Sequence, residues 1–341
     1  MDARARFSPR IALHGIGHLG KTMTRLIRDK GWEIVAAYNR AGEKIGQDLG
    51  TLAGLDKPLG VIVQDSDKAD YTKLKADVAL IAAGDALDDN YPAIERFLSR
   101  GINVLSHGAH MYDPYWFHPE LAEKVDALGK KHNATFTGGG MWDMTRIWSG
   151  LIAAGPCIRI DSIEYITAAE TLRQGAHWAP LLGYGLTVAE YDAKIGRASN
   201  RMADVLQLPS VIVLQQYGFT VTDVKVRQEP VVFDEPVYCP QLDIEYAAGL
   251  CVGRRTLIDV ETREGVTAFT KFEFRVFKPG EIEEGTWKIN GLPGMQVKVI
   301  RDDSSVASAA SLINRIPDVI KAKPGIVTVM DMGPLKHSVF L

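Results

Sequence analysis

The sequence has few cysteines, no excess of positive charge and no metal-binding motif. Only three of its 341 residues are cysteine, and the wide spacing of Cys157, Cys239 and Cys251 argues against a disulfide framework. No Cys-x-x-Cys or His/Cys cluster occurs, so we expect no metal site and interpret the cysteines as small buried apolar residues. The net charge of −3 and the lack of a Lys/Arg block argue against nucleic acid as a partner.

Long apolar runs and a secretion signal are also absent. No stretch approaches the roughly 18–20 apolar residues that span a bilayer, and residues 1–8 lack the apolar core of a signal peptide. We therefore expect a cytoplasmic protein without a membrane partner. An apolar fraction of 46% in 341 residues is enough for two globular domains, each with its own core.

The strongest motif present is a Gly-x-Gly-x-x-Gly turn formed by Gly15, Gly17 and Gly20. An apolar strand precedes the turn, and an amphipathic helix and a second strand (33–38) follow it. In such a turn the first glycine permits the tight bend, the second lets a pyrophosphate approach the backbone, and the third lets the helix pack closely. The helix N-terminus then offers free N–H groups to the phosphates. This context predicts a dinucleotide-binding domain.

The first 150 residues alternate between strand and helix. This order predicts a Rossmann-type, doubly wound parallel sheet with right-handed crossovers. The expected strands are 11–14, 33–38, 60–63, 77–82, 102–106 and 134–137. Besides the helix after the glycine turn, we expect helices opened by Asp89 and Pro92 and over 119–131, each with proline in its first turn.

The pattern changes near residue 158, where strict alternation of apolar and polar residues begins. Alternation is typical of half-buried antiparallel strands and predicts a mixed α+β second domain. Expected strands are 163–167, 221–227, 246–252, 255–260, 272–276 and 295–299, and expected helices are 186–195, 205–208 and 304–315, the last disturbed or ended by Pro317. We predict a dinucleotide-binding domain (1–150), a substrate-binding and dimerisation domain (151–305) and a C-terminal helix and strand (306–341) returning towards the first domain.

The end of the second strand bears on the choice of cofactor. An NAD site usually has Asp or Glu there, to bind the ribose, whereas this chain has the neutral Asn39 followed by Arg40. A planar cation suits a 2′-phosphate, so NADP(H) is favoured. In the alternative, Asn39 binds the ribose of NAD(H) while Arg40 and Lys44 are solvated loop charges. The expected cofactor-binding residues are Gly15, Gly17, His18, Leu19, Gly20, Asn39, Arg40, Ala83, Gly84 and His107.

In seven stretches the sequence resembles that of a known family. They are HGIGHLG (14–20), EKIGQDLGTLAGLDKPLGVIV (43–63), GINV (101–104), HPELAEKVDALGKKH (118–132), GYGLTVAEYD (183–192), QEPVVF (228–233) and INRIPDVIKAKPGIVTVMDM (313–332). In these the chain resembles the 2,4-diaminopentanoate dehydrogenases and related amine dehydrogenases, which are themselves relatives of dihydrodipicolinate reductase. The resemblance implies an NAD(P)-dependent oxidoreductase at a C–N bond, and a homodimer built through the second domain.

Two departures from the family fall where substrate and nicotinamide are expected to meet. The family carries a Glu pair after the fifth strand, and here Ala109 and His110 stand at those positions. The family's Asn-Pro-Gly-Phe stretch is replaced here by the sequence GGGMWDMTR (138–146). The reductase signature His-His-x-x-Lys is also absent, so dihydrodipicolinate is not expected as the substrate.

Without the Glu pair, the candidate catalytic residues are His110, Asp143 and His177. An imidazole titrates near neutral pH and suits proton transfer, although His110 is equally explained as a structural histidine. Asp143 is a candidate to stabilise an iminium, or else to cap a helix that begins near Thr145.

Candidate substrate-binding residues lie on both sides of the expected domain boundary. Trp142 is interpreted as an apolar wall or as core, and Arg146 as a partner of a substrate carboxylate or of Asp143. Arg173 belongs to a polar and aromatic segment that also contains His177. Tyr184 follows, as a proton donor or as packing.

Three functions remain open from the sequence. The first is an NADP(H)-dependent amine dehydrogenase or imine reductase, which acts on a small amine, imine or carbonyl compound. The second is a ketone or aldehyde reductase, or alcohol dehydrogenase, on the same scaffold, with His110 or Tyr184 as the proton donor. The third is a protein that binds NADP without turning it over.

Overall fold

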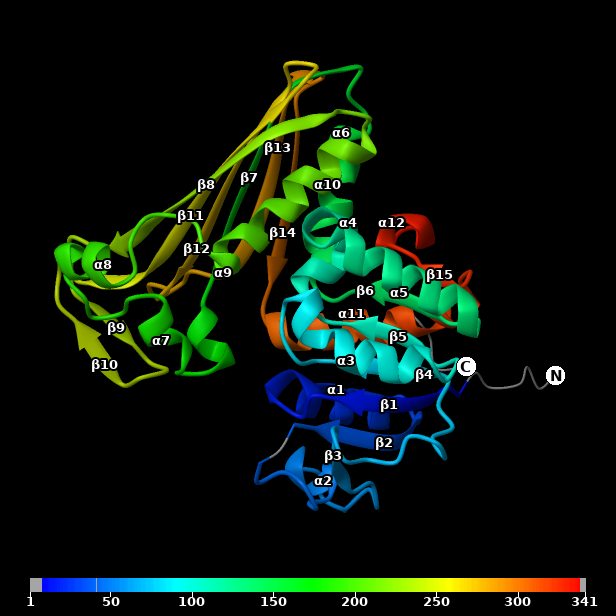
Figure 1. The fold of residues 1–341 in the computed structure, drawn as a ribbon. Coiled ribbons are helices and arrows are strands. Elements are labelled where there is room, and N and C mark those ends of the chain that lie inside the picture. Colours follow the sequence, from blue (N-terminus) through cyan, green and yellow to red (C-terminus); the bar gives the residue numbers. More distant parts are fainter. Residues whose placement is uncertain (1–7, 41, 338–341) are drawn as a thin grey trace, which may run out of the picture. The chain divides into compact units, whose positions relative to one another are not determined.

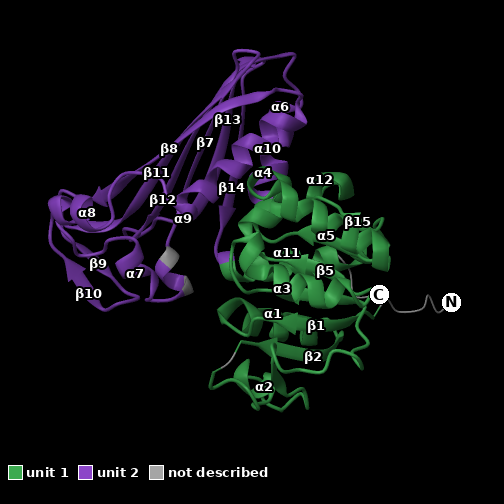
Figure 2. Cartoon of the chain, in the orientation of Figure 1, with its two compact units in different colours: residues 1–143, 305–341 green, residues 144–304 purple. Residues whose placement is uncertain are grey.

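The computed structural model describes residues 8–40 and 42–337 (Figure 1). The chain forms two compact units, coloured separately in Figure 2. Unit 1 comprises Met1–Asp143 and Ser305–Leu341, and unit 2 comprises Met144–Ser304. Within residues 8–40 and 42–337, no helix is long and apolar enough to cross a membrane.

Unit 1 is built on a parallel sheet of seven strands, in the order β15-β6-β5-β4-β1-β2-β3. The strands are β1 (Arg10–His14), β2 (Glu33–Asn39), β3 (Val63–Asp65), β4 (Val78–Ile81), β5 (Asn103–Ser106), β6 (Thr135–Gly138) and β15 (Gly325–Ile326). The helical segments are α1 (His18–Asp29), α2 (Leu49–Leu52), α3 (Leu87–Leu98), η1 (Ala109–Tyr112), α4 (Pro114–Phe117), α5 (Pro119–His132), α11 (Ser304–Lys321) and α12 (Val329–Met332).

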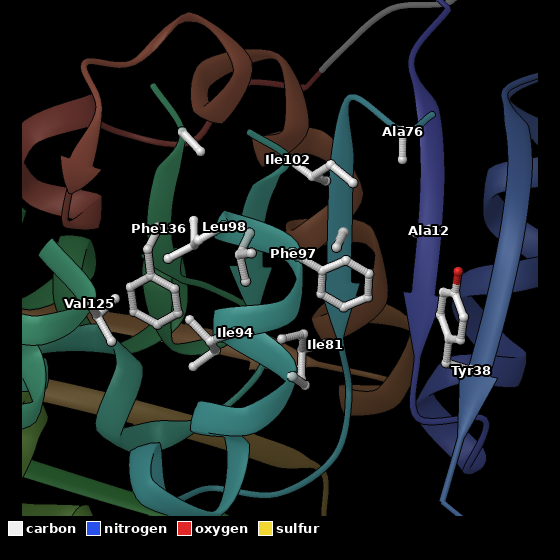
Figure 3. Packing of buried hydrophobic residues seen from close by; sticks show 14 of the residues in the cluster. Ala12, Tyr38, Ala76, Ile81, Ile94, Phe97, Leu98, Ile102, Val125 and Phe136 are labelled. Atoms are coloured by element: carbon white, nitrogen blue, oxygen red, sulfur yellow. The ribbon is translucent and has the colours of Figure 1, made fainter. Parts of the chain in front are cut away.

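Helices cover both faces of this sheet. On one face Phe97 of α3 and Val125 of α5 join a buried cluster with Phe136 of β6 (Figure 3). On the other face Met23 of α1 and Leu312 of α11 belong to a second buried cluster that includes residues of β1, β2 and β4. Burial on both faces explains why the strands are continuous apolar runs.

The order of the strands reverses at the border between β1 and β4. From β1 the chain proceeds outward through β2 and β3, and from β4 it proceeds the other way through β5 and β6. In doubly wound sheets the ligand binds at the carboxyl ends of the strands at such a switch point. The Rossmann-type fold predicted from the sequence is therefore confirmed. The ligand is expected at the turns that follow β1 and β4.

Unit 2 contains a six-stranded mixed sheet, in the order β14-β13-β7-β12-β11-β8, and a small hairpin, β9-β10. Strands β7 and β12 are parallel and the other neighbours are antiparallel. The strands are β7 (Arg159–Ala169), β8 (Val221–Val232), β9 (Val237–Cys239), β10 (Ile244–Tyr246), β11 (Cys251–Thr262), β12 (Thr267–Arg275), β13 (Glu283–Leu292) and β14 (Met295–Arg301). The helical segments are η2 (Asp143–Trp148, a π-helix), α6 (Ser149–Ala154), η3 (Thr171–Gln174), α7 (Trp178–Leu181), α8 (Val188–Lys194), α9 (Arg201–Asp204), η4 (Val205–Gln207) and α10 (Leu208–Gln216).

Several predictions for single elements were wrong in detail. Helix α11 continues through Pro317 to Lys321, and the strand predicted over 246–252 is interrupted by a turn between β10 and β11. Strand β13 and helix α10 were not predicted. Of the cysteines expected to be buried, Cys157 is only half-buried.

Candidate active site

The glycine turn lies at the switch point of the unit 1 sheet. Gly15 has φ +95°, and a Cβ there would lie 2.4 Å from the carbonyl oxygen of Ala82, which follows β4. A Cβ on Gly20 would lie 2.2 Å from the carbonyl oxygen of Gly15, whereas a Cβ on Gly17 would meet nothing within 4 Å. Gly15 and Gly20 are thus required by packing inside the protein, and Gly17 leaves its side of the backbone open.

The end of β2 supports this turn through Asn39. The side-chain oxygen of Asn39 accepts a hydrogen bond from the backbone N–H of Ile16 (3.1 Å), and its Nδ2 donates to the carbonyl of Arg40 (3.0 Å). Asn39 therefore positions the turn, a role that the sequence did not reveal. The side chain of Arg40 is exposed.

The loops after β4 and β5 pack against each other on the other side of the switch point. The N–H of His107 donates to the carbonyl of Ile81 (2.8 Å), and a Cβ on Gly108 would lie 2.8 Å from the carbonyl oxygen of Gly84. Burial lowers the pKa of His107, so its ring is neutral near pH 7. Asp85 also reaches this loop, since its Oδ1 accepts from the N–H of Ala109 (3.3 Å).

His110 is almost fully buried and belongs to a pair of histidines. Its Nδ1 lies 3.0 Å from Nε2 of His118, and its ring stacks on Phe117 with the ring centroids 4.4 Å apart. The N–H of His110 donates to the carbonyl of Asp85 (3.1 Å). Two imidazoles at hydrogen-bond distance share one proton between them, because one ring must donate and the other must accept. His118 was missed in the sequence, where it reads only as the residue before a helix.

Trp142 and Asp143 follow β6 and have different surroundings. The Trp142 ring stacks on Tyr112, with a centroid distance of 5.8 Å and an interplanar angle of 15°. Asp143 is buried, and its Oδ2 accepts from Nε (3.0 Å) and Nη2 (2.5 Å) of Arg315 on α11. Burial raises the pKa of Asp143 to about 6, although Arg315 acts in the opposite direction.

This arrangement corrects one interpretation of Asp143. The helical segment η2 begins at Asp143 itself, so this residue does not cap a helix that begins near Thr145. Its carboxylate instead pairs with Arg315 and so anchors helix α11.

The remaining candidates lie in unit 2. The guanidinium of Arg146 lies over the ring of Phe272, 4.7 Å from its centroid. Arg173 donates from Nε to Oε2 of Glu170 (2.6 Å), so it is engaged in an ion pair. His177 is exposed.

Tyr184 has a buried hydroxyl without a hydrogen-bond partner among the described residues. Its ring packs edge-on against Tyr246, and burial raises the pKa of the hydroxyl well above its usual range. At neutral pH it therefore remains a protonated donor.

Sequence reasoning also missed a buried charged cluster at the end of β7. Glu283 accepts from the backbone N–H of Glu170 (3.1 Å), and its carboxylate lies 3.7 Å from Nε of Arg301. These residues come from separate parts of the chain and form no motif. The only available signal was the alternating strand β13, which begins at Glu283.

Fold and site together define the class of protein. A doubly wound parallel sheet with a glycine turn at its switch point, joined to a unit built on a mixed sheet, is a Rossmann NAD(P)-binding dehydrogenase fold. At the switch point of this sheet, close packing fixes Gly15 and Gly20, and a hydrogen bond from Ile16 to Asn39 fixes the glycine turn.

Comparisons with known proteins identify the group within this class. The chain is similar to an amine dehydrogenase from Mycobacterium smegmatis, at 30% identity and a TM-score of 0.84, over 97% of this chain and 98% of that one. It is 23% identical over 340 residues to 2,4-diaminopentanoate dehydrogenase of Acetoanaerobium sticklandii, covering 95% of this chain and 93% of that protein. A probable dehydrogenase from Thermotoga maritima shares the fold, with 10% identity and a TM-score of 0.59 over 95% and 92% of the two chains.

No protein-family model matches the chain. The chain nevertheless belongs to the amine dehydrogenase family, as the resemblance in its sequence predicted, and it is an oxidoreductase.

Proposed function

We propose that this protein is an NADP(H)-dependent oxidoreductase that acts on a C–N bond, reducing an imine, or a carbonyl compound together with an amine. The observation that carries the proposal is the open backbone at Gly17, at the switch point of a chain that belongs to the amine dehydrogenase family. The expected homodimer and cytoplasmic location remain predictions.

The preference for NADP(H) is supported by the end of β2. Asn39 is neutral and its amide is occupied by Ile16 and Arg40. The exposed Arg40 next to it offers a planar, permanent cation to a 2′-phosphate. No carboxylate ends β2, so the last residue of this strand does not repel that phosphate.

Proton transfer is assigned to His110. The nicotinamide, when bound, supplies the hydride, and the protein has to position the acceptor carbon and move a proton. His110 follows β5 at the carboxyl edge of the sheet, and His118 can take or return the proton that His110 exchanges with the substrate. The remaining catalytic candidates fit less well, because Asp143 is held by Arg315 and His177 is exposed.

Asp85 supports C–N chemistry despite the missing Glu pair. Its carboxylate contacts the N–H of Ala109, at one of the two positions where the family carries Glu. A carboxylate beside a cationic iminium stabilises the charge that the reaction requires. We therefore propose that Asp85 supplies the negative charge that the family takes from the Glu pair.

The cofactor proposal is tested by Gly17→Ala. A Cβ at this position touches nothing in the protein, so the unfolding temperature should stay within about 1–2 °C of the parent. The same Cβ would occupy the approach of the pyrophosphate, so calorimetry should show NADPH binding weakened by about tenfold or more. Gly294→Ala in unit 2, where a Cβ would lie 3.6 Å from the nearest atom, is the matched control and should bind normally. Unchanged NADPH affinity in Gly17→Ala would contradict the proposed site.

The reaction type is tested by following NADPH oxidation with a panel of ketones and aldehydes, with and without ammonium. Dependence on ammonium supports the C–N reaction. Equal rates without ammonium would establish the alternative, a carbonyl reductase, which the missing Glu pair favours. Binding of NADPH without oxidation across the panel would indicate a protein that only binds the nucleotide.

A further inference from the structure

Arg254 is a buried charge in unit 2 that the proposed reaction does not use. It lies on β11 and has no solvent exposure, and Nε, Nη1 and Nη2 all lack a hydrogen-bond partner within the described chain. Its neighbour Arg255 points to the opposite face of the sheet, where Nε donates to Oε1 of Glu273 (2.7 Å). An isolated charge in a protein interior is strongly unfavourable unless it is paired, so Arg254 calls for a counter-charge.

Two of the polar side chains on the inner face of the sheet occupy positions next to Arg254. Thr256 lies two residues along β11, and Gln228 of β8 is directly opposite Thr256. Both are fully buried, and neither Oγ1 of Thr256 nor Oε1 of Gln228 has a hydrogen-bond partner in the described residues. The amide nitrogen of Gln228 is occupied, because Nε2 donates to the carbonyl of Ala198 (2.6 Å). Thr256 and Gln228 therefore place two unsatisfied acceptor-capable atoms on the face that Arg254 occupies.

Helix α8 contributes a fourth polar group near Arg254, the hydroxyl of Tyr191. The hydroxyl of Tyr191 is buried and also lacks a partner among the described residues. The charge of Arg254 acts on this hydroxyl, but burial prevails and raises the pKa of Tyr191 to about 12, so it stays a donor at neutral pH. Tyr191 lies in the stretch 183–192, one of the segments that carry the family resemblance, and the proposed reaction does not use its hydroxyl.

The chemistry of the four groups indicates the sign of the missing partner. A guanidinium has five N–H donors and no acceptor, and the hydroxyls of Thr256 and Tyr191 add further donors. Oε1 of Gln228 is the one side-chain atom among the four that only accepts. The cluster therefore has an excess of donors around a positive charge, which an anion with several acceptor atoms would satisfy.

We propose that Arg254, Thr256, Gln228 and Tyr191 form a buried site for a small carboxylate. Arg254 binds both carboxylate oxygens through two parallel N–H groups, as guanidinium and carboxylate commonly pair. The hydroxyls of Thr256 and Tyr191 donate to the same oxygens, and Gln228 accepts from the remaining N–H of Arg254. The carboxylate is either a free ion, such as formate, or the acid group of a longer molecule. The site lies within unit 2 and does not depend on the proposed reaction.

The test is thermal unfolding of the full chain in HEPES at constant ionic strength, with sodium formate, acetate or 2-oxobutyrate increasing from zero. A ligand that binds only the folded state should raise the unfolding temperature by about 5 °C at 100 times its dissociation constant. Arg254→Met should lose this rise, and the matched control Arg255→Met should keep it. No rise in the parent, or an equal rise in Arg254→Met, would overturn the proposal.

The series of carboxylates separates the two sources. A free-ion site responds to formate and loses the response as the chain lengthens, whereas a site for a longer molecule responds most to 2-oxobutyrate. If Arg254→Met does not fold, crystals of the parent soaked in sodium formate give the answer. Density for a planar anion against the guanidinium of Arg254 supports the site, and an Arg254 without such density contradicts it.

Discussion

Asn39 and Arg40 are adjacent in the sequence but have different structural surroundings. Asn39 holds the glycine turn through Ile16, whereas Arg40 is exposed at the end of β2. Sequence reasoning treated both as contacts for the ribose or its phosphate, because it could not show that the amide is occupied. We therefore propose Arg40 alone as the residue that determines the choice between NADP(H) and NAD(H).

We expect Arg40→Ala to weaken NADPH binding by about tenfold or more, since a charge-assisted hydrogen bond contributes about 1.5–3 kcal/mol. The affinity for NADH should stay within about twofold, because NADH has no 2′-phosphate. Calorimetry with both nucleotides measures the difference. Arg28→Ala is the control, because Arg28 pairs with Asp29 at the end of α1 that is remote from the glycine turn. Equal loss of both nucleotides would show that Arg40 does not read the phosphate.

His14 is a buried histidine directly before the glycine turn. Desolvation lowers its pKa to about 4, and the positive charge of Arg96 acts in the same direction. The unfolded chain, with an ordinary pKa near 6.5, therefore binds more protons than the folded protein between pH 4 and 6.5. Stability consequently falls as the pH falls through this range, by about 3 kcal/mol from this residue.

Replacing His14 with Leu should flatten this part of the stability profile. Urea unfolding between pH 4 and 7 measures it. His132→Gln, at the end of α5, should retain the slope of the parent. A His14→Leu profile as steep as that of the parent would assign the acid sensitivity to other groups.

At the scale of elements, α5 ends in a way that the sequence alone did not reveal. Asn133 follows the helix with φ +53° and ψ +45°, a left-handed conformation that favours glycine or asparagine. Asn133→Ala should lower the free energy of unfolding by about 1 kcal/mol, because a Cβ without a compensating polar group is strained there. Asn133→Gly should be neutral or stabilising. Chemical denaturation of the pair separates backbone conformation from loss of the side chain, and equal destabilisation of both variants would argue against strain.

Helix α11 shows how tertiary contacts override a local signal. Pro317 predicted a disturbed or ended helix, yet the helix runs on to Lys321. Ile316 and Val319, on either side of Pro317, are buried in the unit 1 core. Arg315, also on α11, pairs with the buried Asp143. Burial and the ion pair offset the hydrogen bond that proline removes.

At the scale of the molecule, the sheet of unit 2 exposes one face covered with ion pairs across its strands. They include Lys225–Glu261, Arg255–Glu273, Lys288–Glu164 and Lys298–Glu284. Ile166 and Ile300, on β7 and β14 of the same sheet, are 40% and 57% exposed. We predict that this face forms the homodimer expected through the second domain.

We expect the full chain to elute with about twice its monomer mass of 37.4 kDa when size-exclusion chromatography is coupled to light scattering. Arg227→Glu, which replaces an ion-pair partner of Asp259 by a like charge, should shift the protein towards monomer. Lys57→Glu, on the surface of unit 1, should leave the mass unchanged. A monomeric parent would contradict the predicted dimer.

The sequence by itself determined the Rossmann-type first domain, the mixed second domain, the glycine turn and the family. These depend on the spacing of apolar and glycine residues over short stretches, where local geometry is decisive. Only the tertiary structure decided that Asp143 pairs with Arg315, that His110 lies within hydrogen-bond distance of His118, and that Arg254 is buried with no hydrogen-bond partner among the described residues. Asp143 and Arg315 are 172 residues apart, and the burial of a side chain depends on what packs over it. Neither a distant partner nor the loss of water leaves a local pattern in the sequence, so these arrangements could be found only in three dimensions.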